Sequence, residues 1–507
     1  MLAYATGFGL SVIVSSFLTW AVRNLACHYG LARAPQSNRH IHKTPVPRLG
    51  GLAIFAGFMA VFLLYSVLAN RGVAAPPSNR DIGRILILGA GVFLTGLIDD
   101  LVGVKAWLKL AVEVAAGTGL YFSGIRFDFC ATHVAGSYTS VICFAVTVGW
   151  VVLICNAINL IDGVDGLAAG AALFSMITIF SVAVGVRPGV ANSVVILAGS
   201  LFGFLIFNFN PASIFMGDSG SLFVGFLLSS FVLSEQPRHS ASFSGLLVPL
   251  VCFALPLTDV MLSVLRRFLN GHSLFGADKE HIHHKLLALG LTQRQVVAIL
   301  YGVSAVFSIL SLCLLNPSPA SILPVAGVLL LMIFFGVRKL RYHEFMEVLR
   351  PRSIPLLKRR RLAPNIAIRK AAAGLKMTRD PRTIAILLEG CLSQEFDGFS
   401  VIFSSEFQSP NRQTPQWLSR PLGAHWRHSD ARLTIQLDLN TIDGEQIGQL
   451  HLYHDAETPV LARIELIRTV LRRSLVQGLQ NALDHSFTTV SFPSFKDPLQ
   501  PSDPLEV

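Results

Sequence analysis

Charged residues are scarce in this sequence. Asp, Glu, Lys and Arg make up 14% of its 507 residues, whereas soluble proteins carry about 25%. The seven cysteines are scattered and form no CxxC pair. This spacing excludes a disulfide framework or a thiolate metal centre and favours cysteines that pack as small apolar residues. The shortage of charge argues against a soluble protein over most of the chain.

Apolar residues are abundant instead, at 52% of the chain, and long apolar runs continue to about residue 338. A helix needs roughly 20 apolar residues to cross the ~30 Å hydrocarbon core, and lipid offers no partner for unpaired backbone groups. Eleven candidate spans are centred near residues 13, 59, 91, 115, 147, 176, 198, 226, 254, 305 and 329. The predicted fold class is an all-α polytopic membrane protein with about 11 transmembrane helices and a C-terminal soluble α+β domain.

Basic residues predict the orientation of these spans. With the N-terminus outside, 21 Lys and Arg residues flank the spans on the cytoplasmic side and 6 on the outer side, as the positive-inside rule requires. No basic residue or cleavage site marks the first run as a signal peptide, so we expect a retained span. The prediction is a multi-pass protein of a bacterial inner (plasma) membrane, with its C-terminal domain in the cytoplasm.

The net charge of +11 raises the question of a nucleic-acid partner. Its densest run is Lys358–Arg361, in the basic stretch that follows the last apolar segment. We interpret this run as a basic stretch beside anionic lipid headgroups, with no nucleic acid as partner.

Four regions are expected. They are a transmembrane transferase domain over 1–340, a basic linker over 341–364, a cytoplasmic α+β domain over 365–490 and a disordered tail over 491–507. In the third region, Asp380–Pro381 predicts a helix start and an Asp443–Gly444 turn predicts a hairpin. A final apolar stripe, from Leu461 to Leu479, is interpreted as core or as a dimer seam. This domain resembles a regulatory or GAF-like type.

Polar residues gather in the loops expected on the cytoplasmic side, which is costly near a bilayer and indicates a site. The first of these loops carries Lys43 and Arg48, which could bind phosphate or serve only as positive-inside charges. It ends in Gly50 and Gly51, which allow the backbone to approach another element closely.

The third span ends in Asp99 and Asp100. Their directions differ by about 100° around a helix, so we expect one to face a metal or a lysine while the other accepts a proton. Solvation of a helix end is the alternative, although carboxylates there oppose the helix dipole. Lys109 is a candidate phosphate partner at the start of the next span.

Oxygen-bearing side chains recur every three residues from the end of the fifth span onwards. They are Asn156, Asn159, Asp162 and Asp165. Such a stripe suits Mg²⁺ or hydrogen bonding to a nucleotide, whereas a calcium loop would need a closing Glu. Asp218, between glycines before the eighth span, could complete a metal site with Asn159.

The fifth cytoplasmic loop carries His281, His283 and His284. Three histidines in four residues could bind zinc, act as acid or base, or donate to a diphosphate. Because oxygen-rich partners dominate elsewhere and thiolates are missing from these motifs, phosphate binding is the preferred interpretation.

In this order, the motifs resemble those of the bacterial polyprenyl-phosphate N-acetylhexosamine-1-phosphate transferases (glycosyltransferase family 4). The resemblance covers roughly residues 1–340 and rests on HKTPVPRLGG, GLIDD, NAINLIDGVDGLAAG, MGDSGSL and DKEHIHHKL. Three positions depart from the family pattern: Ala34 replaces a common acidic residue, Lys279 a frequent arginine and Glu113 a usual amide. The reaction class is unaffected, and the sugar stays open, with the histidine motif closer to the N-acetylglucosamine-type branch.

The resemblance implies transfer of a hexosamine 1-phosphate from a UDP-sugar to undecaprenyl phosphate, with release of UMP. It implies Mg²⁺, with Mn²⁺ as an alternative, held by Asn159 and Asp218. Asp99 and Asp100 would be catalytic. The residues expected to bind substrates are Lys43, Arg48, Lys109, Asn156, Asp162, Asp165, His281, His283 and His284. A homodimer stays open, as do two other functions: a membrane transporter and the peptidoglycan-precursor (MurNAc-pentapeptide) phosphotransferase.

Overall fold

The structure is a computed structural model, and the chain forms two compact units. One consists of residues 1–265 and 274–340, the other of 266–273 and 341–507. The described residues of the first unit and its margins are 1–31, 46–70, 80–127, 138–235, 244–270, 281–315 and 318–339. Those of the C-terminal part are 362–393, 396, 398–404, 419–421, 433–441, 446–454, 464 and 466–486.

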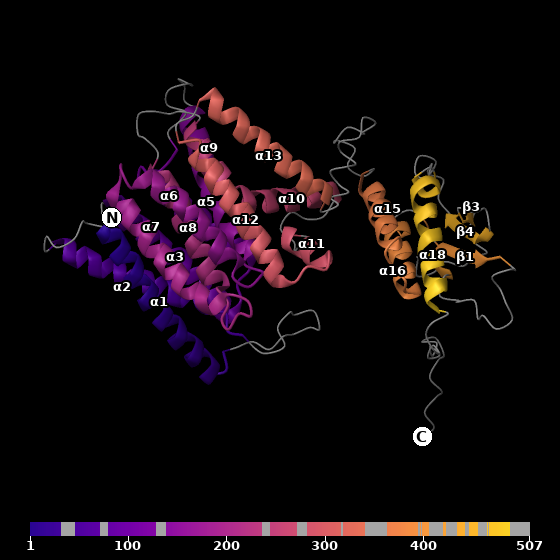
Figure 1. The fold of residues 1–507 in the computed structure, drawn as a ribbon, viewed down its shortest axis with the longest axis horizontal. Helices are drawn as coiled ribbons and strands as arrows, with labels where there is room; N and C mark the ends of the chain where they lie inside the picture. The colour runs from indigo at the N-terminus through magenta and orange to yellow at the C-terminus, as the bar shows by residue number, and fades with distance from the viewer. Residues whose placement is uncertain are drawn as a thin grey trace. The chain divides into compact units, whose positions relative to one another are not determined.

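The N-terminal part is built of helices alone in its described residues, apart from an isolated bridge at Val46 (Figure 1). The helices are α1 (Leu2–His28), α2 (Gly50–Asn70), α3 (Arg80–Val102), α4 (Ala106–Phe122), α5 (Tyr138–Ile161), α6 (Leu167–Ala183), α7 (Pro188–Asn208), α8 (Gly217–Glu235), α9 (Ser244–Cys252), α10 (Ala254–Asn270), α11 (Ile282–Ala288), α12 (Gln293–Leu312) and α13 (Pro319–Lys339).

Seven of the described helices are long and apolar enough to cross a membrane: α1, α2, α3, α5, α7, α8 and α12. A helix lies at each of the eleven predicted centres, but eleven spans are not confirmed. The apolar stretches of α6 and α13 are shorter, and α4 has 17 residues, or about 26 Å at 1.5 Å per residue. The span predicted near residue 254 is divided between two consecutive helices, α9 and α10. Pro249 lies inside α9 and Pro256 in the first turn of α10, where a missing N–H is tolerated.

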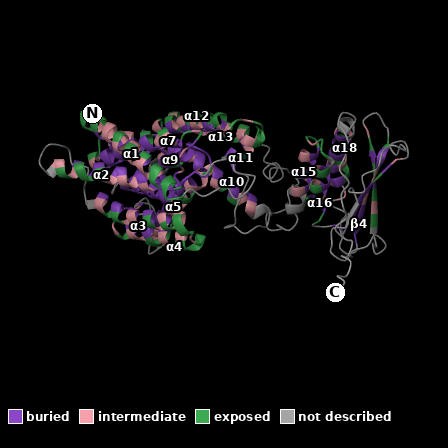
Figure 2. Ribbon diagram, turned by 90° about the horizontal axis from the view of Figure 1, so that it is seen from below, coloured by how far each residue is buried: buried purple, intermediate pink, exposed green. Residues whose placement is uncertain are grey.

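Helix α8 is the central helix of the bundle. Of its apolar stretch, 89% is buried inside the protein, against 22% for α1. It packs against α3, α5 and α2, and Gly225 allows its backbone to lie against Cys155 of α5. The helices are buried where they face one another, and intermediate or exposed on the outside (Figure 2). Exposed apolar residues on that outside, such as Phe17 and Ile87, suit contact with lipid.

The start of α2 and the segment before it pair with the segment before α8, although the paired residues are 165 to 168 positions apart in the sequence. Phe215 N–H donates to Pro47 O at 2.8 Å, and Gly51 N–H donates to Met216 O at 2.8 Å. A Cβ on Gly51 would lie 2.1 Å from the backbone nitrogen of Gly220. The predicted close backbone approach at the double glycine is therefore confirmed, and it fixes where α8 begins.

The C-terminal unit holds a small antiparallel sheet beside helices. Its elements are α15 (Leu362–Leu375), α16 (Pro381–Leu392), β1 (Gly398–Phe403), β2 (Ser419–Pro421), β3 (Leu433–Asn440), β4 (Gln446–His454), the π-helix η4 (Ile467–Leu471) and α18 (Arg472–Ser486). The strand order is β2-β1-β4-β3. Asp380 caps α16 and the β3–β4 pairing is antiparallel, as predicted. The turn at 442–445 and the start of the final apolar stripe at Leu461 lie outside the described residues. Leu471, Leu475 and Leu479 are buried in this unit's own core, so the final stripe is core.

Candidate active site

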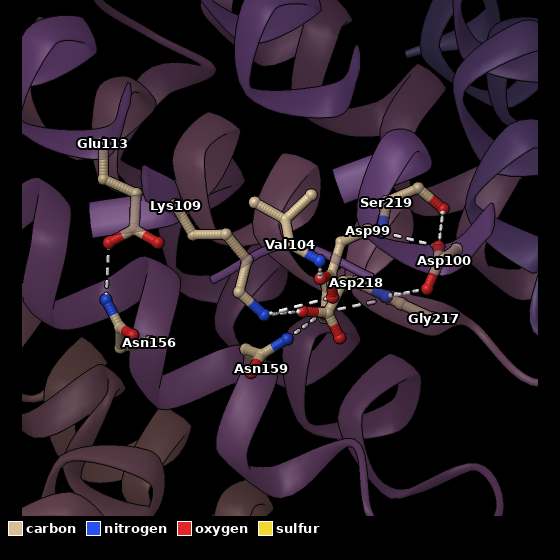
Figure 3. A network of polar contacts seen from close by, with 11 residues as sticks. Asp99, Asp100, Val104, Lys109, Glu113, Asn156, Asn159, Gly217, Asp218 and Ser219 are labelled. Atoms are coloured by element: carbon tan, nitrogen blue, oxygen red, sulfur yellow. Dashed lines mark hydrogen bonds and ion pairs between the residues drawn. The ribbon is translucent and has the colours of Figure 1, made fainter. Parts of the chain in front are cut away.

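Polar side chains from four helices meet in one cluster (Figure 3). They lie at the end of α3, the start of α4, the end of α5 and the start of α8. Successive helices run in opposite directions, so the loops that the sequence singles out return to the same end. The structure thereby brings together Asp99, Asp100, Lys109, Asn159 and Asp218.

Lys109 lies between two carboxylates. Its Nζ is 3.1 Å from Asp99 Oδ2 and 2.5 Å from Asp218 Oδ2. The other oxygen of Asp99 accepts the Val104 N–H at 2.6 Å, which fixes the turn from α3 to α4. The carboxylates are 17% and 26% exposed, so a small anion or cation from solvent can reach this cluster. One lysine against two carboxylates leaves the cluster negative, and it therefore favours an added cation.

Asp100 has a different set of contacts from Asp99. Its carboxylate accepts the backbone N–H groups of Asp218 and Ser219, both at 2.9 Å, and the Ser219 hydroxyl at 2.6 Å. It therefore caps the start of α8 from a neighbouring helix. Gly96 makes this possible, because a Cβ there would lie 2.6 Å from Asp218 O. The prediction that one of the two aspartates faces a lysine is confirmed for Asp99. Proton transfer by Asp100 stays a prediction.

Asp162 lies in the turn after α5 and interacts with this cluster. Loss of water, together with the negative charges of Asp218 and Asp100, raises the pKa of its carboxyl well above its usual range. A hydrogen bond from the Gly217 backbone and the positive charge of Arg48 act in the opposite direction. Arg48 of the first loop and Asp162 of the turn after α5 are therefore close enough for their charges to interact. Lys43 lies outside the described residues.

The remaining members of the predicted stripe have separate partners. Asn159 Nδ2 donates to Ser221 Oγ at 2.9 Å, which leaves its carbonyl oxygen as an acceptor or ligand. Asn156 Nδ2 donates to Glu113 of α4. Asp165 is buried and accepts from Asn210 Nδ2 and Ala212 N–H, both at 3.0 Å. Its visible contacts hold the loop after α7, and nucleotide binding by Asp165 stays a prediction.

The histidine motif is anchored by Asp259 of α10, a residue that the sequence interpretation missed. Its carboxylate accepts the Ile282 N–H at 2.8 Å and lies 3.2 Å from His281 Nδ1. Asp259 is 2% exposed, and an acidic residue inside an apolar helix is the signal that could have identified it. The rings of His281 and His283 stack with centroids 5.6 Å apart. His283 Nε2 would lie 3.3 Å from a Cβ on Gly163, so the motif borders the turn that carries Asp162.

His283 makes the stability of this region depend on pH. Burial and the neighbouring His284 lower the pKa of His283 to about 4, so its ring is neutral at pH 7. The unfolded chain binds this proton at a higher pH than the folded chain does. The contribution of His283 to the free energy of unfolding is therefore fully present above about pH 6.5 and falls as the pH drops towards 4. We expect the melting temperature to fall less between pH 7 and pH 5 in His283→Gln than in the unchanged protein.

The matched control for this experiment is His28→Gln, at the exposed end of α1. It should show the same pH dependence as the unchanged protein when melting is followed in detergent. An equal fall in all three proteins would show that His283 is not the titrating group.

The chemistry of the donors at the α3–α8 cluster suits a hard cation. Asp99, Asp162, Asn159 and Asp218 offer oxygen atoms, and no thiolate is among them. Within the described ranges, no three His, Cys, Asp or Glu side chains converge as a preformed metal site. Mg²⁺ is commonly held by one or two carboxylates together with waters and substrate phosphates. The residues present therefore fit Mg²⁺ better than zinc.

Comparison with known proteins identifies the family. Residues 83–235, which span α3 to α8, match the family described as glycosyl transferase family 4. The chain is 32% identical over 317 residues to a probable undecaprenyl-phosphate N-acetylglucosaminyl 1-phosphate transferase of Bacillus subtilis, covering 62% of this chain and 86% of the relative. It is 36% identical over 317 residues to the decaprenyl-phosphate N-acetylglucosaminephosphotransferase of Mycobacterium tuberculosis, covering 57% and 77%.

A more distant relative is the phospho-N-acetylmuramoyl-pentapeptide-transferase of Staphylococcus aureus, 28% identical over 301 residues, which cover 55% of this chain and 87% of the relative. These matches cover most of each relative. On this evidence the chain is a multi-pass membrane protein that belongs to glycosyl transferase family 4.

Proposed function

We propose that this protein transfers an N-acetylhexosamine 1-phosphate from a UDP-sugar to undecaprenyl phosphate and thereby starts a lipid-linked cell-envelope glycan. The observation that carries the proposal is the Asp99–Lys109–Asp218 cluster at one end of a bundle of apolar helices. A lipid phosphate lies at headgroup level, and a soluble nucleotide can reach the same level from the aqueous side.

In the proposed reaction, an oxygen of the lipid phosphate attacks the β-phosphorus of the UDP-sugar. The bond from that phosphorus to the bridging oxygen breaks, and UMP leaves with the bridging oxygen. Phosphoryl transfer depends on alignment and charge neutralisation more than on covalent help. Lys109 and Arg48 would neutralise phosphate charge, and Asp99 would position the lipid phosphate and remove its proton. A two-step route through an aspartyl phosphate is the alternative.

Mg²⁺ is part of the proposal, with Mn²⁺ as a substitute. Asn159 would hold it through its amide oxygen, and Asp218 through the carboxylate oxygen that does not contact Lys109. When bound, the ion would neutralise charge that develops on the diphosphate. His281, His283 and His284 would face the diphosphate or the nucleotide from the other side of the Asp162 turn.

The position of the site also supports a cellular location for the protein and helps to weigh the alternative functions. We propose a bacterial plasma membrane, with the site and the C-terminal unit in the cytoplasm, because basic residues concentrate on that side. A transporter would place its key polar groups near the bilayer midplane, whereas these lie at helix ends. MurNAc-pentapeptide transfer remains the second candidate, favoured by the Staphylococcus aureus relative. A homodimer is open to test by mass measurement in detergent.

The purified protein should release UMP from UDP-N-acetylglucosamine only when undecaprenyl phosphate is present. Excess EDTA should lower turnover by at least about a hundredfold, since one ion would supply several kcal/mol of charge stabilisation, and Mg²⁺ should restore it. A panel of UDP-sugars, including UDP-MurNAc-pentapeptide, identifies the donor. Absence of UMP with every donor would refute the proposed function, and full turnover in EDTA would refute the metal.

A further inference from the structure

A buried carboxylate lies one helical turn beyond Lys109 and has no assigned role in the reaction. It belongs to Glu113, which is 2% exposed on α4. Its Oε2 accepts a hydrogen bond of 2.5 Å from Asn156 Nδ2 of α5. Asn156 is exposed and lies one turn before Asn159 (Figure 3). Burial of a carboxylate is costly unless the carboxylate is paired. The contact between Glu113 and Asn156 therefore calls for an explanation.

The hydrogen bonds fix the orientation of the Asn156 amide. The same nitrogen that meets Glu113 also lies 2.8 Å from the carbonyl oxygen of Val152. A backbone carbonyl can only accept, so the atom facing it must be the NH₂ group, whatever the protonation of Glu113. Both N–H groups of Asn156 are thereby used within the protein. Only its carbonyl oxygen is left for a substrate.

Electrostatics join this pair to the reaction centre. Glu113 interacts with the positive charge of Lys109 and with the negative charge of Asp218. The pair therefore borders the Lys109 cluster, and Asn156 is its exposed member. An ionised carboxylate accepts hydrogen bonds and never donates, whereas an amide at position 113 could do either. A glutamate thus adds a second acceptor to the Val152 carbonyl for the Asn156 NH₂ group, whereas a glutamine could turn its own NH₂ group towards it.

We propose that Glu113 is a positioning residue that holds Asn156 with its carbonyl oxygen towards the donor substrate. Position 156 then selects a hydrogen-bond donor, a hydroxyl or an amide N–H, on the UDP-sugar. This inference rests on the proposed function and adds the residue that sets the polarity of the contact. Both the sugar and the nucleoside carry such donors, and UMP carries only those of the nucleoside.

Four variants test the donor–acceptor direction of the hydrogen bond between residues 113 and 156 by changing it. N156D places two carboxylates together and should raise KM for the UDP-sugar at least about tenfold, the effect of about 1.4 kcal/mol. E113Q alone should raise it about threefold, within the range of one hydrogen bond, because its amide can bind in two orientations. E113Q/N156D should lower KM about threefold below that of N156D, within the range of one hydrogen bond, and the recovery is partial because the carboxylate oxygen that replaces Nδ2 also faces the Val152 carbonyl oxygen. In that double variant the amide introduced at position 113 donates, and the carboxylate introduced at position 156 still presents an acceptor to the substrate.

The fourth variant, E113Q/N156L, is the matched control. It has no buried unpaired carboxylate and presents no acceptor, so KM should stay raised about tenfold while kcat changes less. Melting temperatures of all four variants separate this pattern from misfolding. A rise in the inhibition constant of UMP that parallels KM would place the contact on the nucleoside. An unchanged constant would place it on the sugar.

Two results would overturn the inference. One is a double variant E113Q/N156D no better than N156D although both proteins melt like the unchanged protein. The other is a normal KM in E113Q/N156L. Either result requires an active unchanged protein, so failure of the inference is distinct from failure of the proposed function, in which the unchanged protein itself releases no UMP.

Discussion

Replacing Asp218 by asparagine is expected to lower kcat about a thousandfold, the cost of removing one well-placed electrostatic group from a site of this kind. The change keeps the side-chain shape and the backbone N–H that binds Asp100. It removes the charge that faces Lys109 and the carboxylate proposed to hold Mg²⁺. Folding should survive, because Lys109 keeps its contact with Asp99. UMP release at saturating substrates measures the effect.

A control of the same chemistry is available at the other end of α3. Asp81 lies 3.6 Å from Arg84, and Asp81→Asn should leave kcat within about twofold, because Asp81 lies at the opposite end of α3 from the Lys109 cluster. More than a tenth of normal turnover in Asp218→Asn would mean that this carboxylate is neither a ligand nor part of the charge balance.

The sequence predicts where this site lies, because of a simple property of membrane bundles. Each span reverses the chain, so motifs in alternate loops return to one end, and the ends of helices define which residues meet. Asp99, Lys109, Asn159 and Asp218 could be placed together on this ground, and the structure brings them together. The apolar runs likewise predict helices at the right positions.

What each polar group contacts could not be predicted. A neighbouring pair such as Asp99 and Asp100 differs only in rotation about the helix axis, and that rotation is set by close packing at Gly96. The role of Asp259 depends on a contact 22 to 23 residues away in the chain. The break between α9 and α10 depends on prolines that a helix can also tolerate. These are effects of tertiary packing, which periodicity does not encode.

The different contacts of the two aspartates at the end of α3 can be separated by experiment. Asp100→Asn turns an NH₂ group towards at least one of the three donors at the start of α8. A buried donor without an acceptor costs about 1–3 kcal/mol, so the melting temperature should fall. Turnover should fall too, because the backbone of Asp218 shifts. Asp99→Asn keeps an oxygen for the Val104 N–H and should melt close to the unchanged protein.

For Asp99→Asn we expect kcat to fall about a hundredfold or more, the usual contribution of a group that moves a proton or positions the reacting phosphate. Ser219→Ala, which removes one of the three bonds to Asp100, should lower the melting temperature by less than Asp100→Asn. Measurement of kcat and melting temperature together separates the two roles. If Asp100→Asn were as stable as the unchanged protein but lost as much turnover as Asp99→Asn, Asp100 would be a reacting group. The hydrogen bonds from α8 would then orient the Asp100 carboxylate, because they would contribute nothing measurable to stability.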